Sequence, residues 1–450
     1  MPRSKRLMGA IAIAVPVLLV FSACAPSGTT AGAASVGAVS KDISGKHVTL
    51  KLLDFWQQDK WVTDSISAFE KAHPNVTIDR TTQAWGQVTS TLNLRLNDPN
   101  GPDIATANNG WQSLGTLAQG GRVLNLDKYA ALYGWKSEFP TSQLKQVEFT
   151  ADGKNMGTGS IYATPTSRSS LIGLYYNKSI LDSLGIPVPK SLAEFEAACA
   201  KVKAAGKIPI AYGSQDQGSA TAILFALQDL VGGANTIGNF VYSSNSVSLA
   251  KTGMTQAASK VKTYADNNWL TPNYPGINYV DAGANFVHGQ GAFRFDYTGS
   301  LPLTTADNSK FGYVQLPQGS TTNVVGTGAA NGIMTVSSKT KNPNVAAAFL
   351  DYLASKQAAQ TAVDDGFLPL LHSGLTAPAN NALLATEVTG QEALDKSDGY
   401  VPYFDWSTPT MITTLGGQLQ ELLAGRVTPE QLTRAGQKDY DTFQAKRKQG

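Results

Sequence analysis

The fold is decided by residues 48–80, VTLKLLDFWQQDKWVTDSISAFEKAHPNVTIDR. Val48 to Phe55 is a short, mostly apolar run, which is typical of a buried strand. Trp61 to His73 then places apolar residues at helical spacing, and Pro74 ends the run. Val76 to Arg80 follows as a second strand. This order of strand, helix and strand predicts the start of an open parallel sheet that helices cover on both faces.

The same alternation continues along the chain. A helix is predicted from Gln87 to Leu96 and a third strand from Ile104 to Ala107. Ser191, with an acidic residue three positions later, predicts the capped start of another helix, and Ile208 to Tyr212 reads as a further strand. About 400 residues of this α/β pattern are too many for one hydrophobic core, so the sequence predicts two lobes.

The N-terminus predicts export. Basic residues precede an apolar run from Leu7 to Phe21, and small residues lead from there to Cys24. This pattern predicts a lipoprotein signal peptide over residues 1–23 and lipidation of Cys24. About 15 apolar residues are fewer than the roughly 20 that span a bilayer, so a retained membrane helix is the weaker interpretation. Phe21 stands where such sites usually carry Leu, which leaves open an ordinary cleaved signal and a secreted protein.

A flexible tether is predicted after the signal. Residues 25–40 contain only small or uncharged side chains, with no large residue to anchor a core. We therefore expect a lipid-anchored tether over residues 24–40 and a folded part that begins near Lys41.

Charge, cysteine and motif content exclude several classes of function. The chain has 36 Lys and Arg against 33 Asp and Glu, and three of the basic residues lie in the signal, so no nucleic-acid partner is expected. Cys199 is the second of two cysteines and falls on an apolar helical face, which predicts a buried thiol and no disulfide. The four His residues form no HExxH motif, and neither GxSxG nor GxxxxGK[ST] occurs. No metal, cofactor or catalytic residue is therefore predicted.

Polar and aromatic side chains follow the first three predicted strands. Parallel sheets bind ligands at the carboxyl ends of their strands. Aromatic rings suit the apolar faces of sugars, and amides and carboxylates suit their hydroxyl groups. The candidate ligand-binding residues in these loops are Trp56, Gln57, Asp59, Trp85, Asn108, Asn109 and Trp111. The alternatives are that each Trp is a core residue and that Asp59 caps the following helix.

Short segments in a fixed order carry a resemblance over nearly the whole chain. They are FEKAHPNV (69–76), GPDI (101–104), YATP (162–165), YYNK (175–178), GQGAF (289–293) and GFLP (366–369). Together with the lipobox-like start, this order resembles the family 1 extracellular solute-binding proteins, the maltodextrin-binding-like receptors of sugar ABC importers.

The resemblance implies a type II periplasmic-binding-protein-like fold, in which two α/β lobes are joined by three crossovers around a ligand cleft. The N-terminal lobe is expected to comprise residues 41–170 plus 316–368. The C-terminal lobe is expected to comprise residues 171–315 plus 369–450.

Further ligand-binding candidates follow from positions that match the family. They are Arg168, Asp216, Gln217, Asp296, Tyr297, Asn331 and Trp406. Trp406 resembles the aromatic platform that precedes a C-terminal helix in the family. Asp216 and Asp296 can instead cap loops, and Arg168 can instead brace a hinge.

The expected function is binding of a carbohydrate, an oligosaccharide in particular, and its delivery to the permease subunits of an ABC importer. The resemblance implies a monomer on the outer face of the cell membrane that contacts the membrane only through its lipid anchor. Two alternatives stay open, a secreted glycoside hydrolase with paired carboxylates and a carbohydrate-sensing surface receptor without a transport role. The sequence does not indicate which sugar is bound.

Overall fold

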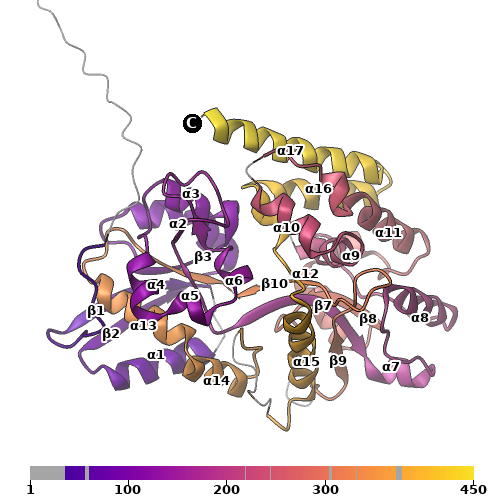
Figure 1. The fold of residues 1–450 in the computed structure, drawn as a ribbon. Helices are drawn as coiled ribbons and strands as arrows, with labels where there is room; N and C mark the ends of the chain where they lie inside the picture. The colour runs from indigo at the N-terminus through magenta and orange to yellow at the C-terminus, as the bar shows by residue number, and fades with distance from the viewer. Residues whose placement is uncertain are drawn as a thin grey trace, which may run out of the picture. The chain divides into compact units, whose positions relative to one another are not determined.

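The computed structural model describes residues 36–55, 60–217, 219–243, 245–303, 307–330, 332–370, 375 and 378–449 (Figure 1). The predicted signal peptide, Cys24 and the first part of the predicted tether lie outside these residues. The end of that tether is already packed, because Val36 is buried and the Lys128 Nζ donates a hydrogen bond of 2.8 Å to its carbonyl oxygen. In the described part, no helix combines the length and the apolar character needed to cross a membrane.

The first sheet has the strand order β2-β1-β3-β11-β6. Its strands are β1 (Val48–Asp54), β2 (Val76–Thr82), β3 (Ile104–Ala107), β6 (Thr164–Pro165) and β11 (Ile333–Val336). The helices of the same chain segments are α1 (Lys60–Ala72), α2 (Trp85–Asn97), α3 (Leu114–Gln119), α4 (Asp127–Tyr133), α5 (Trp135–Glu138), α6 (Thr141–Leu144), α13 (Pro343–Ala354) and α14 (Lys356–Asp364). A separate two-stranded sheet joins β4 (Glu148–Phe149) to β5 (Ser160–Ile161).

The second sheet has the order β12-β10-β7-β8, and β9 also pairs with β7. Its strands are β7 (Ser169–Asn177), β8 (Phe293–Tyr297), β9 (Phe311–Val314), β10 (Gly326–Ala330) and β12 (Tyr400–Val401). Its helices are α7 (Lys178–Ser183), α8 (Leu192–Ala204), α9 (Ala222–Gly232), α10 (Ala234–Tyr242), α11 (Met254–Asp266), α12 (Tyr279–Val287), α15 (Ala382–Ser397), α16 (Met411–Leu423) and α17 (Pro429–Gln449). Figure 1 shows β7 and β10 between the two groups of helices.

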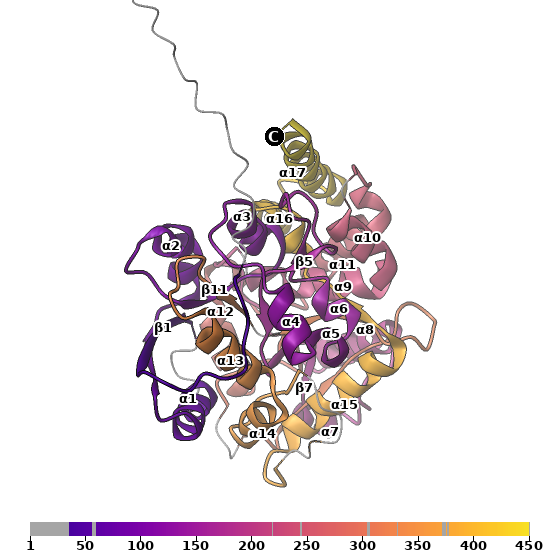
Figure 2. The ribbon, with the colours of Figure 1, turned by 60° about the vertical axis from the view of Figure 1, so that its left-hand side comes forward.

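Local sequence explains where these elements begin and what they bury. The Ser191 hydroxyl accepts a hydrogen bond of 3.2 Å from the Glu194 backbone N–H and so caps α8 as predicted. The buried face of α1 carries Trp61, Val62 and Phe69. Phe69 contacts the ring of Phe349 on α13, and Figure 2 shows α13 and α14 beside α1. Cys199 is buried on α8 and makes no disulfide, which confirms that prediction.

Three details of the predicted fold differ from the structure. β1 pairs parallel with β2 and β3 as expected, whereas β7 pairs antiparallel with β8, β9 and β10. The predicted strand at Ile208 to Tyr212 is reduced to single bridges at Ile210, because its neighbours Leu270 and Phe293 each meet it at one residue. β10 pairs with β7 and β12, so the strand pairing favours a second crossover between β10 and β11 and not at residues 315–316. The lobe boundaries otherwise stay predictions.

Buried carboxylates make the stability of this fold depend on pH. Burial raises the pKa of Asp229, of Glu387 and of Asp405 to about 7. The unfolded chain releases these protons near pH 4, so the folded state holds extra protons between pH 4 and 7. We expect the stability that these groups contribute to be complete below pH 4 and to be lost as the pH rises through 7.

The variant Asp229→Asn tests this dependence. Asp229 Oδ2 accepts hydrogen bonds from the Thr327 N–H (2.6 Å) and the Thr327 hydroxyl (2.8 Å), and an amide oxygen can accept both. Urea denaturation at pH 5 and pH 8 should show that the wild type loses more unfolding free energy than the variant, by on the order of 1–3 kcal/mol. Equal losses in the two proteins would contradict the account.

Candidate ligand-binding site

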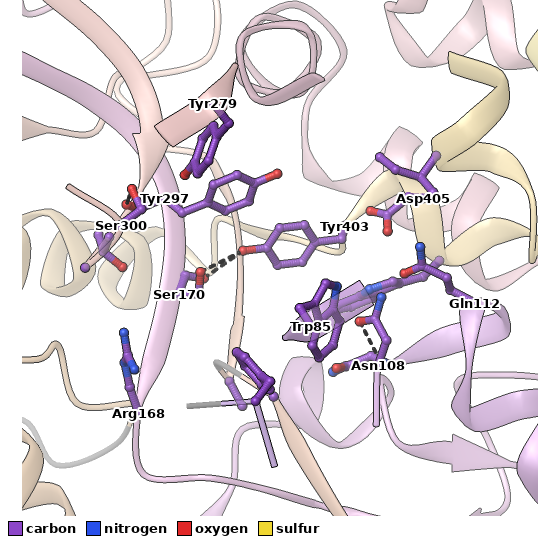
Figure 3. Close-up of a pocket in the computed structure, with 18 residues that line it drawn as sticks. Trp85, Asn108, Gln112, Arg168, Ser170, Tyr279, Tyr297, Ser300, Tyr403 and Asp405 are labelled. Carbon is purple, nitrogen blue, oxygen red and sulfur yellow. Dashed lines mark hydrogen bonds between the residues drawn. The ribbon is translucent and has the colours of Figure 1, made fainter. Parts of the chain in front are cut away.

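A pocket of about 480 Å³ collects residues from loops that follow strands of both sheets. Six aromatic side chains, several amides and hydroxyls, one carboxylate and one guanidinium line it (Figure 3). The lining residues are Phe55, Trp85, Asn108, Asn109, Gln112, Arg168, Ser170, Tyr279, Tyr297, Thr298, Gly299, Ser300, Ala330, Gly332, Tyr403, Asp405, Trp406 and Ile412. Such a mixture binds an apolar face and a polar edge of one ligand.

The first wall lies at the carboxyl ends of β1, β2 and β3. Phe55 and Trp85 contact edge to face, with ring centroids 4.6 Å apart, and Trp85 stays 37% exposed. The Asn108 side-chain oxygen accepts a hydrogen bond of 2.9 Å from the Asn109 N–H, and the Asn109 amide donates to Gln146 Oε1 at 3.1 Å. Because the Asn109 side chain is already hydrogen-bonded to Gln146, the side chains of Trp85 and Asn108 are better placed to contact a ligand.

The second wall is a cluster of rings. Tyr297, the last residue of β8, and Tyr403, just before the short 3-10 helix η5 (Phe404–Ser407), stack with centroids 6.1 Å apart and planes at 13°. Tyr403 also lies 5.1 Å from the Trp406 ring. The Tyr403 hydroxyl donates to the backbone oxygen or to the hydroxyl of Ser170, each at 3.2 Å, as Figure 3 shows. This wall is therefore an ordered aromatic surface.

Arg168 lies where the chain enters β7. Its guanidinium carbon sits 3.8 Å from the centroid of the Phe367 ring, and its backbone forms a bridge with Pro369. Burial lowers the pKa of Arg168 to about 9, and the nearby carboxylate of Glu387 acts in the opposite direction. Glu387 itself accepts a hydrogen bond of 2.5 Å from the Tyr175 hydroxyl. Arg168 thus lines the pocket, and the carboxylate of Glu387, which does not line it, stabilises its positive charge.

Among the described residues that line the pocket, Asp405 supplies the carboxylate. It belongs to η5 and is only 7% exposed. Burial raises its pKa to about 7, with a hydrogen bond to its own backbone as the one opposing cause. Figure 3 shows Asp405 and Gln112 on the same side of the pocket, with Arg168 on the far side of Tyr403.

The structure brings six of the predicted site residues to the pocket: Trp85, Asn108, Asn109, Arg168, Tyr297 and Trp406. Four others do not line it: Trp111, Asp216, Gln217 and Asp296. The predictions at Trp56, Gln57, Asp59 and Asn331 lie outside the described residues.

Packing explains why Trp111 points elsewhere. Its ring is buried against Phe149 (5.1 Å between centroids) and Phe443 (5.2 Å), and the Arg447 guanidinium lies over it at 4.9 Å. The core alternative is therefore correct for this residue. The sequence around Trp111 resembles that around Trp85, so local sequence does not separate them.

Two of the three polar residues that do not line the pocket hold a residue that does. Asp296 pairs with the buried Arg294 and accepts a hydrogen bond of 2.5 Å from the Tyr279 hydroxyl. Asp216 accepts a bond of 2.6 Å from the Tyr279 N–H at the start of α12. Gln217 contacts Gln420, at 3.3 Å between the two amides. Asp216 and Asp296 thus position the Tyr279 ring.

Several lining residues were missed, chiefly Gln112, Ser170, Tyr279, Tyr403 and Asp405. Tyr403 and Asp405 flank Phe404 beside the predicted Trp406, so the aromatic run itself was a usable signal. Tyr279 carried no signal, because Asn278 marks only the start of a helix. Among the residues that the structure describes, no group of His, Cys, Asp and Glu is arranged to hold a metal ion.

Two named relatives share parts of this sequence. The multiple sugar-binding protein of Streptococcus mutans serotype c is 25% identical over 228 residues, which is 50% of this chain and 54% of the relative. A probable sugar-binding periplasmic protein of Mesorhizobium japonicum is 27% identical over 175 residues, which is 38% of this chain and 39% of the relative. The chain thus spans about half of the first relative's length and less of the second's.

Solved structures match over most of the chain. A chitin oligosaccharide binding protein superposes with a TM-score of 0.72 at 22% identity, over 88% of this chain and 99% of that one. The GacH receptor of Streptomyces glaucescens, solved unliganded and with acarbose, gives a TM-score of 0.68 at 18% identity, over 89% and 99%. These likenesses confirm the predicted type II two-lobed α/β fold.

The family model for bacterial extracellular solute-binding proteins matches residues 64–386. That range covers more than half of the chain and includes loops from both walls of the pocket. This chain belongs to the family of bacterial extracellular solute-binding proteins.

Proposed function

We propose that this chain is an extracytoplasmic receptor that binds an oligosaccharide in the pocket and delivers it to the permease subunits of an ABC importer. The observation that carries the proposal is the composition of the pocket, six aromatic side chains interleaved with amides, hydroxyls and a carboxylate. Sugar rings present apolar C–H faces to aromatic rings and hydroxyl groups to planar polar partners.

The size of the pocket favours more than one sugar ring. Its volume of about 480 Å³ lies in the range of small-molecule sites, and rings are available on both walls. Trp85 stands on the first wall, and Tyr297 and Tyr403 stand on the second. A ligand that touches both walls holds them together, so contacts present only in a closed form favour closure.

Family membership and the names of the relatives support the transport role. Both named relatives are described as sugar-binding, and members of the family are extracellular. We further propose that the protein is a monomer and that a lipid on Cys24 anchors it, with residues 25–35 as a tether.

The protein is proposed to bind without chemistry. A glycoside hydrolase places two carboxylates about 5 to 10 Å apart around the scissile bond. Among the described residues that line the pocket, Asp405 is the one carboxylate. No observation on the described residues favours the other alternative, a carbohydrate-sensing surface receptor without a transport role.

A thermal-shift screen of residues 25–450 against mono-, di- and oligosaccharides tests the function, with amino acids as contrasts. A ligand at a hundred times its Kd should add about 2.7 kcal/mol to the unfolding free energy, which raises the Tm by a few degrees. We expect a shift with oligosaccharides and no hydrolysis product in the recovered mixture. No shift with any carbohydrate would contradict the proposal, and product formation would favour the hydrolase.

Trp85→Ala tests the aromatic contact on the first wall. Loss of an exposed ring that stacks on a sugar should weaken oligosaccharide binding by about 1–2 kcal/mol, measured by calorimetry, with little change in Tm. Trp406→Ala is less suitable, because Trp406 is 2% exposed and packs against Gly110, so its removal also disrupts the core.

Leu94→Ala is the matched control for Trp85→Ala. Leu94 lies on the same helix, α2, and is 76% exposed, but it does not line the pocket. Its replacement should leave the affinity unchanged. An equal loss in both variants, or no loss in Trp85→Ala, would remove Trp85 from the binding surface.

A further inference from the structure

Asp405 is a buried carboxyl group without a basic partner in the described part of the chain. No Lys, Arg or His of that part lies within ion-pair distance of its carboxylate, and the residue is only 7% exposed. The undescribed residues after position 36 include no Lys or Arg and one His, His372. A buried carboxylate that lacks a positive partner is costly, and a bound cation relieves that cost.

The elements packed against η5 do not supply the missing charge. They are the 3-10 helix η1 (Gly110–Gln112), α10 and α16. Their one charged residue is Glu421, which is paired with Arg426 at the surface. The titratable groups that face Asp405 are the phenols of Tyr297 and Tyr403, and its charge contributes to raising the pKa of both.

The other charge of the pocket is already balanced. Arg168 interacts with Glu387, which lies behind the pocket, and its guanidinium stacks on Phe367. Arg168 and Asp405 stand on opposite sides of Tyr403 (Figure 3). Asp405 therefore sits in a separate negative region of the pocket.

A second acceptor without a donor stands on the same side. The side-chain oxygen of Gln112 is buried and has no hydrogen-bond partner among the described residues. Figure 3 shows it next to Asp405. The rings of Tyr403 and Trp406 are close by, and their faces attract cations. An ammonium group has one positive charge and up to three N–H donors, whereas a hydroxyl has one donor and no charge.

We propose that the pocket selects a sugar that carries a protonated amine, held by the carboxylate of Asp405 and the amide oxygen of Gln112 beside the rings of Tyr403 and Trp406. This inference rests on the proposed sugar-binding function and names the class of sugar. Arg168 lines the other end of the same pocket. Discrimination between amino and neutral sugars is therefore assigned to Asp405.

Calorimetric titration with matched sugars tests the inference at pH 7 and low salt. The probes are cellotriose, its N-acetylated analogue chitotriose and the free-amine glucosamine trisaccharide, which share one linkage and differ in the group on C2. Glucose, galactose and their 2-amino forms extend the series to single rings. The amine member of at least one series should bind about tenfold more tightly than its neutral partners.

Asp405→Asn should reduce that preference to about twofold or less, because it removes the charge and keeps the shape. Gln112→Leu should weaken binding of the amine member more than binding of its neutral partners, because it removes the amide oxygen that accepts from the ammonium group. Asp182→Asn makes the same charge change at an exposed position on α7 and should retain the preference. Thermal unfolding checks that each variant is folded.

Proton release gives a readout that a purely structural role of Asp405 would not produce. The ammonium group should lower the pKa of Asp405, so binding near pH 6, where both the free amine and Asp405 are mostly protonated, should release protons in the wild type but not in Asp405→Asn. Titrations in buffers of different ionisation enthalpy measure this release.

The outcomes separate this inference from the function on which it rests. Tighter binding of the neutral partners, or an amine preference that survives Asp405→Asn, would overturn the inference and leave the sugar receptor standing. Failure of every neutral and amino sugar to bind would contradict both.

Discussion

The pairing of β7 with strands on both of its sides is the constraint on which the pocket depends. Ser170 of β7 lies opposite Ala329 of β10, and Ile172 lies opposite Tyr297 of β8. This register brings together the segments around Ser170, Tyr297 and Ala329. Tyr403 then ties η5 to the same strand through Ser170. A slip of β7 by one residue would reverse which side chains face the pocket.

Charge is distributed unevenly around this frame. Arg294 and Asp296 neutralise each other under the Tyr279 ring, and Arg168 has Glu387 behind it. Asp405 is the exception, since the described residues leave its carboxylate facing the pocket without a cation. Burying a polar group without a hydrogen-bond or ionic partner costs free energy. Proteins retain such groups at functional sites, where a ligand can supply the partner.

Much of the fold could be predicted because its signals are local. The periodicities around β1 and α1, and the cap at Ser191, need only a few neighbouring residues. The antiparallel pairing of β7 could not be predicted, because its partner strands are distant in sequence and the residues of β7 do not indicate which strands they pair with. The same limit applies to the site: Trp85 and Trp111 have similar surroundings in sequence, but Phe443 and Arg447 of the C-terminal helix bury only Trp111. Asp405 was not among the predicted site residues, because the surroundings of its carboxylate are visible only in three dimensions.

The central claim is that one ligand contacts loops from both sheets at once. Amide hydrogen exchange, followed by mass spectrometry with and without a saturating sugar, tests it most directly. The account predicts slower exchange at residues 108–112 of the first wall and at residues 297–300 and 403–407 of the second wall. Protection confined to one wall, or located away from these loops, would contradict it.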